Sequence, residues 1–186
     1  NQRTKKTKTA IIVSTGPSLN KQLELLKQAQ NHATIISIDA SYPILKAHGI
    51  KPDYATTMER CPETSEFFNS AVSAFDNEII FCATTLTHPN TVKHLKCRNA
   101  SYIFRPLAYE KGFDDEDFGY LCGGPSAAHF AFDLAVYLEH EKIIFIGQDL
   151  AYGQGRSTHA TGHIATEAAE LDKKADTEYA PAYGGD

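Results

Sequence analysis

The sequence predicts an α/β fold, and three observations carry this prediction. Short apolar runs alternate with segments of helical periodicity, an order typical of parallel strands joined by right-handed crossovers. Several runs are continuously apolar, as at 11–13 and 143–146, which favours strands covered on both faces. Polar residues gather where the runs end. Together they indicate a Rossmann-like open, mostly parallel sheet of about six strands with helices on both faces.

The expected strands are the apolar runs, which are rich in Ile and Val. They are residues 10–14, 34–38, 54–57, 79–83, 102–105 and 142–146. Cys82 lies within one of these runs and Cys97 near another, so both thiols are expected in the core.

The segments between the runs carry helical signals of unequal strength. From Leu19 on, leucines recur at i, i+4 and i+7 and form an apolar stripe along residues 20–30. Residues 43–48 form a short helix candidate that ends at Gly49, a natural C-terminal cap. Weaker helix candidates cover residues 63–74 and 90–95.

The strongest helix signal covers residues 126–139, which are apolar on almost every side and are therefore expected to be buried. Residues 164–174 are rich in Ala, Glu and Lys and predict an exposed helix. Two segments are expected to be loops. Residues 108–124 are acidic and contain glycine, and we interpret them as a loop or lid over the sheet; residues 151–162 are rich in Gly, Ser and Thr.

The composition excludes several classes of function. With 186 residues, 42% apolar and 22% charged, the chain suits one globular domain. Its net charge of −5 disfavours a nucleic acid partner. It contains no apolar run of ~18 residues, so no membrane span is predicted.

The termini and the cysteines bear on location. The start lacks the apolar segment of a secretory signal, and the four cysteines have no CxxC spacing, so we expect reduced thiols and a cytoplasmic location. The chain begins with Asn1 and stops at Asp186 without a closing element. We therefore expect residues 1–186 to be a single α/β domain excised from a longer chain.

The first run ends in Gly16, Pro17 and Ser18, a strand-to-helix turn. Glycine lets a ligand approach the backbone, proline presets the first helical φ, and serine is a good cap. Free N–H groups at such a helix start attract phosphate, so the turn is either a phosphate site or a plain capped turn. It is neither GxGxxG nor a Walker loop, so NAD and P-loop binding lose their main support.

Two carboxylates follow the second and third runs. Asp39 stands where doubly wound folds often hold a carboxylate that accepts ribose hydroxyls, and its alternative role is to cap the next helix. Glu59 is a candidate for binding a sugar, a base or a metal, and its alternative role is pairing with Arg60.

Gly124, Pro125 and Ser126, which precede the apolar helix, repeat the order of the first turn. A second anion site is therefore expected at Gly124 and Ser126. His129 and Asp133 share one helical stripe with Ser126, and we interpret that stripe as a hydrogen-bonded or solvated face rather than a catalytic triad.

One carboxylate and one histidine of the second half are catalytic candidates. Asp149 follows the sixth run and Gln148, and either takes part in catalysis or holds the next loop by accepting N–H bonds. His159 is a candidate general acid or base, because imidazole titrates near neutral pH. His163 forms an HxxxH pair with it, but the surrounding Gly, Ser and Thr indicate a loop, so no metal ligands are assigned.

Two motifs, in this order, carry a resemblance to a known family. The first is IIVSTGPSL at 11–19 with IKPDY at 50–54, and the second is GQDLAY at 147–152 with THA at 158–160. They resemble the central MptE-like (6-hydroxymethylpterin diphosphokinase-like) domain of the motility accessory factor (Maf) flagellin glycosyltransferases. The resemblance covers nearly the whole chain, and the plan is also similar to that of bacterial sialyltransferases that use CMP-sialic acid.

The resemblance implies a role in bacterial flagellar protein glycosylation, and so in flagellum assembly and motility. The donor would be a CMP-activated nonulosonic acid, the acceptor flagellin Ser or Thr, and no cofactor would be required. His159 or Asp149 would be the base. The residues expected at the nucleotide are Gly16, Pro17, Ser18, Asp39, Glu59, Gly124, Ser126, Gln148 and Tyr152.

Two other functions stay open. The archaeal relatives transfer diphosphate from ATP to a hydroxymethylpterin with Mg²⁺, and the carboxylates of Asp39, Glu59 and Asp149 would suit that reaction. A non-enzymatic flagellin-binding module would instead have no nucleotide affinity and an exposed apolar patch.

Overall fold

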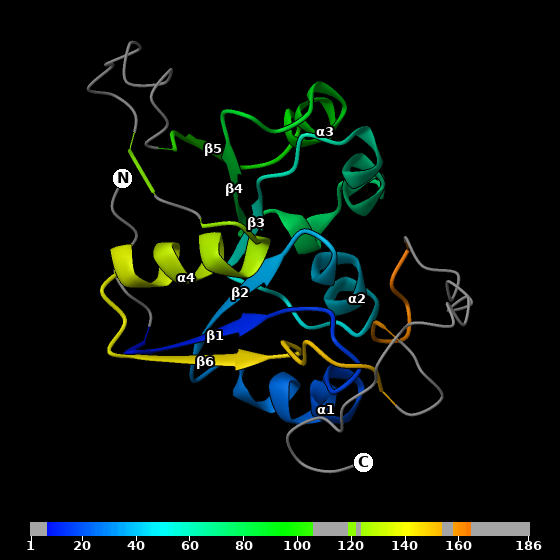
Figure 1. The fold of residues 1–186 in the computed structure, drawn as a ribbon, viewed down its shortest axis with the longest axis vertical. Coiled ribbons are helices and arrows are strands. Elements are labelled where there is room, and N and C mark those ends of the chain that lie inside the picture. The colour runs from blue at the N-terminus through cyan, green and yellow to red at the C-terminus, as the bar shows by residue number, and fades with distance from the viewer. Residues whose placement is uncertain (1–6, 106–118, 122–123, 154–157, 165–186) are drawn as a thin grey trace, which may run out of the picture.

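The computed structural model describes residues 7–105, 119–121, 124–153 and 158–164. Its six strands form one sheet in the order β5-β4-β3-β2-β1-β6, and every neighbouring pair is parallel (Figure 1). The strands are β1 (Thr9–Val13), β2 (Thr34–Ile38), β3 (Tyr54–Thr57), β4 (Ile80–Thr84), β5 (Ala100–Ile103) and β6 (Lys142–Ile146). The predicted fold class is confirmed, and five strands lie within one residue of their predicted bounds. The fifth lies two residues earlier than predicted.

Helices fill most of the connections, as predicted. They are α1 (Leu19–Ala29), α2 (Ser41–Ala47), α3 (Pro89–Leu95), α4 (Ala127–Tyr137) and the two 3₁₀ helices η1 (Pro62–Phe68) and η2 (Ala74–Asp76). The single helix predicted over 63–74 is wrong, because Ser73 starts a new element. Its N–H and hydroxyl both bind the carboxylate of Asp76, in a capping box that begins η2.

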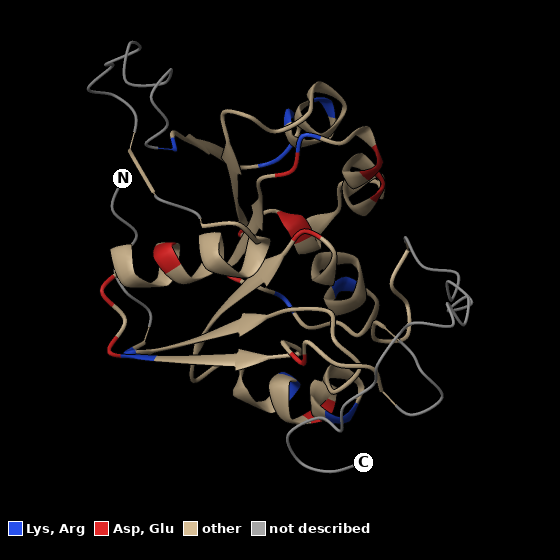
Figure 2. Cartoon of the chain, viewed as in Figure 1, with Lys and Arg blue, Asp and Glu red and all other residues tan. Residues whose placement is uncertain are grey.

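The sheet is covered on both faces, but unequally. On one face the leucine stripe of α1 and part of α2 pack on β1 and β2, in a cluster that includes Leu19, Leu23 and Ile35. On the other face α4 packs through Phe130 and Leu134 against β1, β2 and β3. Figure 2 shows the strands almost entirely free of charge, with charged residues on the helices and connections. The core is therefore two apolar layers that share one sheet.

Two burial predictions are wrong at the β6 edge. The helix expected to be buried on all sides, α4, exposes 38% of Phe132 and 52% of Val136. In β6, Ile144 and Phe145 are 47% and 44% exposed, although a continuous apolar run predicted cover on both faces. The reason is position: β6 is an edge strand, and the described residues place no further layer over the outer side of α4.

Cys82 is buried as expected, whereas the prediction of a buried Cys97 is wrong, because Cys97 lies two residues beyond the end of α3 and is exposed. The predicted helix at 164–174 and most of the predicted lid at 108–124 lie outside the described residues. The described part of 151–162 has neither helix nor strand, as predicted. Within the part of the chain that is described, no helix is both long and apolar enough to cross a membrane.

Candidate functional site

The topology places a crevice between the ends of β1 and β6. From β1 the chain builds the sheet in one direction to β5, and it then returns to place β6 on the other side of β1. In open α/β sheets, ligands bind beyond the carboxyl ends of the strands at such a switch point. A cavity of about 520 Å³, here called the β1 cavity, lies there. Its lining includes Ser14, Gly16, Ser126, Gln148, Asp149, Tyr152 and His159.

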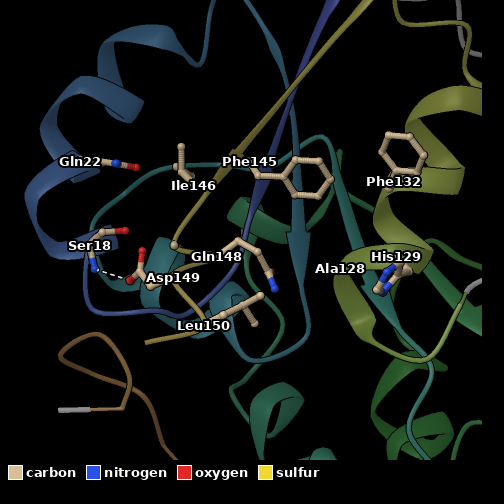
Figure 3. Close-up of a pocket in the computed structure, with 11 residues that line it drawn as sticks. Ser18, Gln22, Ala128, His129, Phe132, Phe145, Ile146, Gln148, Asp149 and Leu150 are labelled. Atoms are coloured by element: carbon tan, nitrogen blue, oxygen red, sulfur yellow. Dashed lines mark hydrogen bonds between the residues drawn. The ribbon is translucent and has the colours of Figure 1, made fainter. Parts of the chain in front are cut away.

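Figure 3 shows the residues that line a second cavity of about 640 Å³, here called the β6 cavity. The two share Ala128 and residues 147–150 in their linings. The β6 cavity adds Gln22 from α1 and the rings of Phe132 and Phe145, which stack with centroids 5.9 Å apart. Both volumes are within the range of small-molecule sites.

The ends of β1 and β6 are bound tightly to each other. The Gly16 N–H donates to the Gly147 carbonyl over 2.6 Å, and the Ser14 hydroxyl donates to Gln148 Oε1 over 2.7 Å. Gly147 has a φ of +66°, and a Cβ there would lie 2.5 Å from the Ser14 carbonyl oxygen. Glycine is therefore required at 147 to hold the floor of the cavities.

The first Gly-Pro-Ser turn is closed by the protein itself. Asp149 Oδ2 accepts the Ser18 N–H over 2.7 Å (Figure 3). The next three N–H groups, from Leu19 to Lys21, donate to carbonyls of the turn, and Pro17 has none. The predicted Ser18 cap is wrong, because its side chain makes no capping bond and Asp149 takes that place. The phosphate predicted at this turn would meet a carboxylate.

The second Gly-Pro-Ser turn is open. Gly124 has a φ of +48° and Ser126 is extended, so the chain enters α4 abruptly. The Ser126 hydroxyl lies 2.7 Å from Nδ1 of His129. The N–H groups of Ala127 and Ala128 have no acceptor among the described residues, and both residues line the β1 cavity. This is the arrangement that binds anions at a helix start.

A cation stands beside the second turn. Arg105, just after β5, donates from Nη2 to the Gly124 carbonyl over 2.8 Å. This bond ties the end of β5 to the second turn and places a cation beside it, whereas the first turn holds the carboxylate of Asp149.

The loop that carries His159 is fastened to the first turn. The Ala160 N–H donates to the Thr15 carbonyl over 2.7 Å, and the Thr161 N–H donates to Asn20 Oδ1 over 3.1 Å. His159 lines the β1 cavity and stacks on His163 with ring centroids 4.1 Å apart. Burial, and then the charge of His159, lowers the pKa of His163 to about 4.

Asp39 and Glu59 lie apart from the two cavities. Asp39 is 4% exposed, and its carboxylate accepts the Ala40 N–H and the Thr57 hydroxyl. Burial raises its pKa to about 6 against the effect of these hydrogen bonds. Glu59 is exposed. Neither residue is in the lining of the β1 cavity or the β6 cavity, so their roles in nucleotide binding stay predictions.

The three carboxylates considered for a metal are not gathered. Asp149 lies beyond β6, whereas Asp39 and Glu59 follow β2 and β3. No group of three or more His, Cys, Asp or Glu side chains among the described residues is arranged to hold a metal ion. Mg²⁺ prefers several oxygen ligands in octahedral geometry, so these side chains do not by themselves fit it.

Sequence reasoning missed several residues of the site. Leu150 has a φ of +51° and is 91% exposed at the junction of the two cavities. Phe132 and Phe145 looked like core residues in the sequence. The exposed rings have no local signal, because their exposure depends on the edge position of β6.

Fold and site define a Rossmann-like α/β domain with a cavity at its switch point. The chain belongs to the MptE-like family, whose model is described as "6-hydroxymethylpterin diphosphokinase MptE-like" and matches residues 1–155. The fold is similar to that of a solved Maf glycosyltransferase from Magnetospirillum magneticum AMB-1, at 21% identity and a TM-score of 0.67. That match covers 82% of this chain and 24% of the solved chain, so this chain spans about a quarter of its length. The search of curated proteins returns no match.

Proposed function

We propose that this chain is a glycosyltransferase domain that transfers a nonulosonic acid from a CMP-activated donor to Ser or Thr hydroxyls of flagellin. The main observation in support of this function is the β1 cavity, whose lining includes both the start of α4 and His159. Membership in the MptE-like family and a fold shared with a Maf glycosyltransferase support the same function.

In this proposal the donor phosphate binds at the second turn. The N–H groups of Ala127 and Ala128 and the hydroxyl of Ser126 contact its oxygens. When the bond between the anomeric carbon and the phosphate oxygen breaks, CMP leaves with one more negative charge. The free N–H groups and the positive end of α4 stabilise that charge as it develops. No cofactor is required for this step.

His159 serves as the general base. The acceptor hydroxyl oxygen bonds to the anomeric carbon, and its proton passes to the imidazole. The loop bonds at Ala160 and Thr161 keep His159 at the cavity. Tyr152 and Gln148, which line the same cavity, contact the donor.

The test is calorimetric titration with CMP, CTP and ATP, each with and without Mg²⁺, on the wild type and on Ala127→Pro. Proline is well tolerated at the first helical position, and the extended Ser126 suits the residue before a proline. The variant loses one N–H that the phosphate needs, so CMP binding should weaken about tenfold.

Ala127→Gly is the matched control, because it changes the same side chain and keeps the N–H. Its affinity for CMP should stay within about twofold of the wild type. Equal CMP affinity in Ala127→Pro and Ala127→Gly would contradict phosphate binding at the second turn.

The family description favours a second candidate, a Mg²⁺-dependent diphosphokinase that uses ATP and a hydroxymethylpterin. Tight ATP binding only with Mg²⁺ would select it. The exposed apolar side chains of Phe132, Phe145 and Leu150 favour a third, the flagellin-binding module. The absence of affinity for all three nucleotides would select that one.

A further inference from the structure

We propose that Asp149 is the specificity-determining residue of the two cavities: its fixed carboxylate admits ligands with one phosphate group and rejects those with two or three. The inference rests on the nucleotide site proposed above. It adds to that site the length of phosphate chain that the protein accepts.

Asp149 stands between the cavities and lines both of them. Within the described residues it is the sole Asp or Glu in either lining, and neither lining contains Lys or Arg. Among the described lining residues, its negative charge is therefore balanced by no lysine or arginine. Sites for nucleoside diphosphates and triphosphates are normally rich in cations, which makes this lining unusual for them.

The carboxylate is held in place rather than free to turn away. Its Oδ2 accepts the Ser18 N–H over 2.7 Å. A Cβ on Gly16 would lie 2.4 Å from the same oxygen, which measures how closely the carboxylate packs on the backbone of the turn. The Gly16 N–H is itself bound to the Gly147 carbonyl, so the backbone that leads into Asp149 is tied to the turn that its carboxylate contacts.

The opposite wall carries the start of α4. The N–H groups of Ala127 and Ala128 have no acceptor among the described residues, and they favour a phosphate at the second turn. Any further phosphate in the shared space between Ala128 and residues 147–150 meets the carboxylate. Two like charges within about 5 Å in a partly buried site lower affinity about tenfold or more.

The experiment compares the dissociation constants of CMP, CDP and CTP in EDTA for the wild type, Asp149→Asn and Glu141→Gln. Asn keeps an acceptor for the Ser18 N–H and removes the charge. We expect the wild type to prefer CMP over CDP by about tenfold or more, and Asp149→Asn to lose most of that preference while CMP affinity changes less than about threefold. Glu141→Gln removes the same charge from the opposite end of β6, where Glu141 pairs with Lys8, and should keep the wild-type ratio.

An unchanged CMP to CDP ratio in Asp149→Asn would overturn the proposal. So would CTP binding that appears with Mg²⁺ in the wild type and vanishes in Asp149→Asn, because Asp149 would then be a metal ligand.

Titration with inorganic phosphate and pyrophosphate distinguishes a failure of this proposal from a failure of the proposed glycosyltransferase function. If the wild type binds no CMP, the proposed function fails. A gain of pyrophosphate binding in Asp149→Asn still supports the role of Asp149, and no gain overturns it.

Discussion

Residues 16–18 and residues 124–126 both read Gly-Pro-Ser, and each precedes a helix of 11 residues. At the first turn Ser18 is already helical, and the carboxylate of Asp149 fills the helix start. At the second turn Ser126 is extended, and the N–H groups of Ala127 and Ala128 have no acceptor among the described residues. The same local sequence thus gives one closed and one open helix start, and the difference comes from the carboxylate that the fold brings to the first turn.

The Gly16→Ala variant should break the first turn and give the largest effect. A Cβ at this position would lie 2.6 Å from the Gly147 carbonyl oxygen as well as against Asp149, and the carbonyl belongs to backbone that cannot move freely. We expect a loss of about 3 kcal/mol in the free energy of unfolding, measured by urea denaturation.

Gly119→Ala is the control for this change, because a Cβ there has no neighbour within 4 Å. It should alter the free energy of unfolding by less than about 0.5 kcal/mol. If Gly16→Ala and Gly119→Ala lower the free energy of unfolding by the same amount, the close packing of the first turn makes no specific contribution to stability.

Gly124→Ala tests the second turn and should have an intermediate effect. The φ of +48° disfavours Ala, and its Cβ would lie 2.6 Å from Cβ of His129. Because Cβ of His129 moves only with the backbone of α4, relief requires a shift of the helix start, and we expect a loss of about 2 kcal/mol together with weaker CMP binding. Gly49→Ala, with a φ of +67° and no atom within 4 Å of its Cβ, isolates the cost of the backbone conformation. CMP affinity equal to that of the wild type in Gly124→Ala would argue against an anion at the second turn.

The strands could be predicted closely because short runs rich in Ile and Val favour the strands of a parallel sheet, as in the fully buried β2. The exposure of β6 could not be predicted from the sequence, because the edge position of this strand depends on how the chain returns past β1. The same applies to the outer face of α4. Its apolar residues fit a buried helix equally well, and the local pattern does not say which side is left open.

The candidate site was predictable in part. The polar strand ends that follow β1 and β6 do meet in one cavity, because parallel strands share their carboxyl edge. Asp39 and Glu59 end their strands in the same way, yet β2 and β3 lie farther along the sheet from the switch point. The capping of α1 was hidden for another reason, since its acceptor lies 131 residues away in the chain.

The smallest expected effect on stability is that of Ser18→Ala, which tests whether α1 is capped by the Ser18 side chain or by the distant Asp149. Serine in this position usually stabilises a helix start by about 1 kcal/mol, through a bond from its own oxygen. The Ser18 side chain makes no such bond, so Ser18→Ala should change the free energy of unfolding by less than about 0.5 kcal/mol. Asp149→Ala removes the acceptor of the Ser18 N–H and should cost about 1 kcal/mol or more in the same urea titration. If Ser18→Ala instead lowered the free energy of unfolding more than Asp149→Ala, the Ser18 side chain would be the cap of α1. Asp149 would then not be needed as that cap and would be available for another role in the cavity.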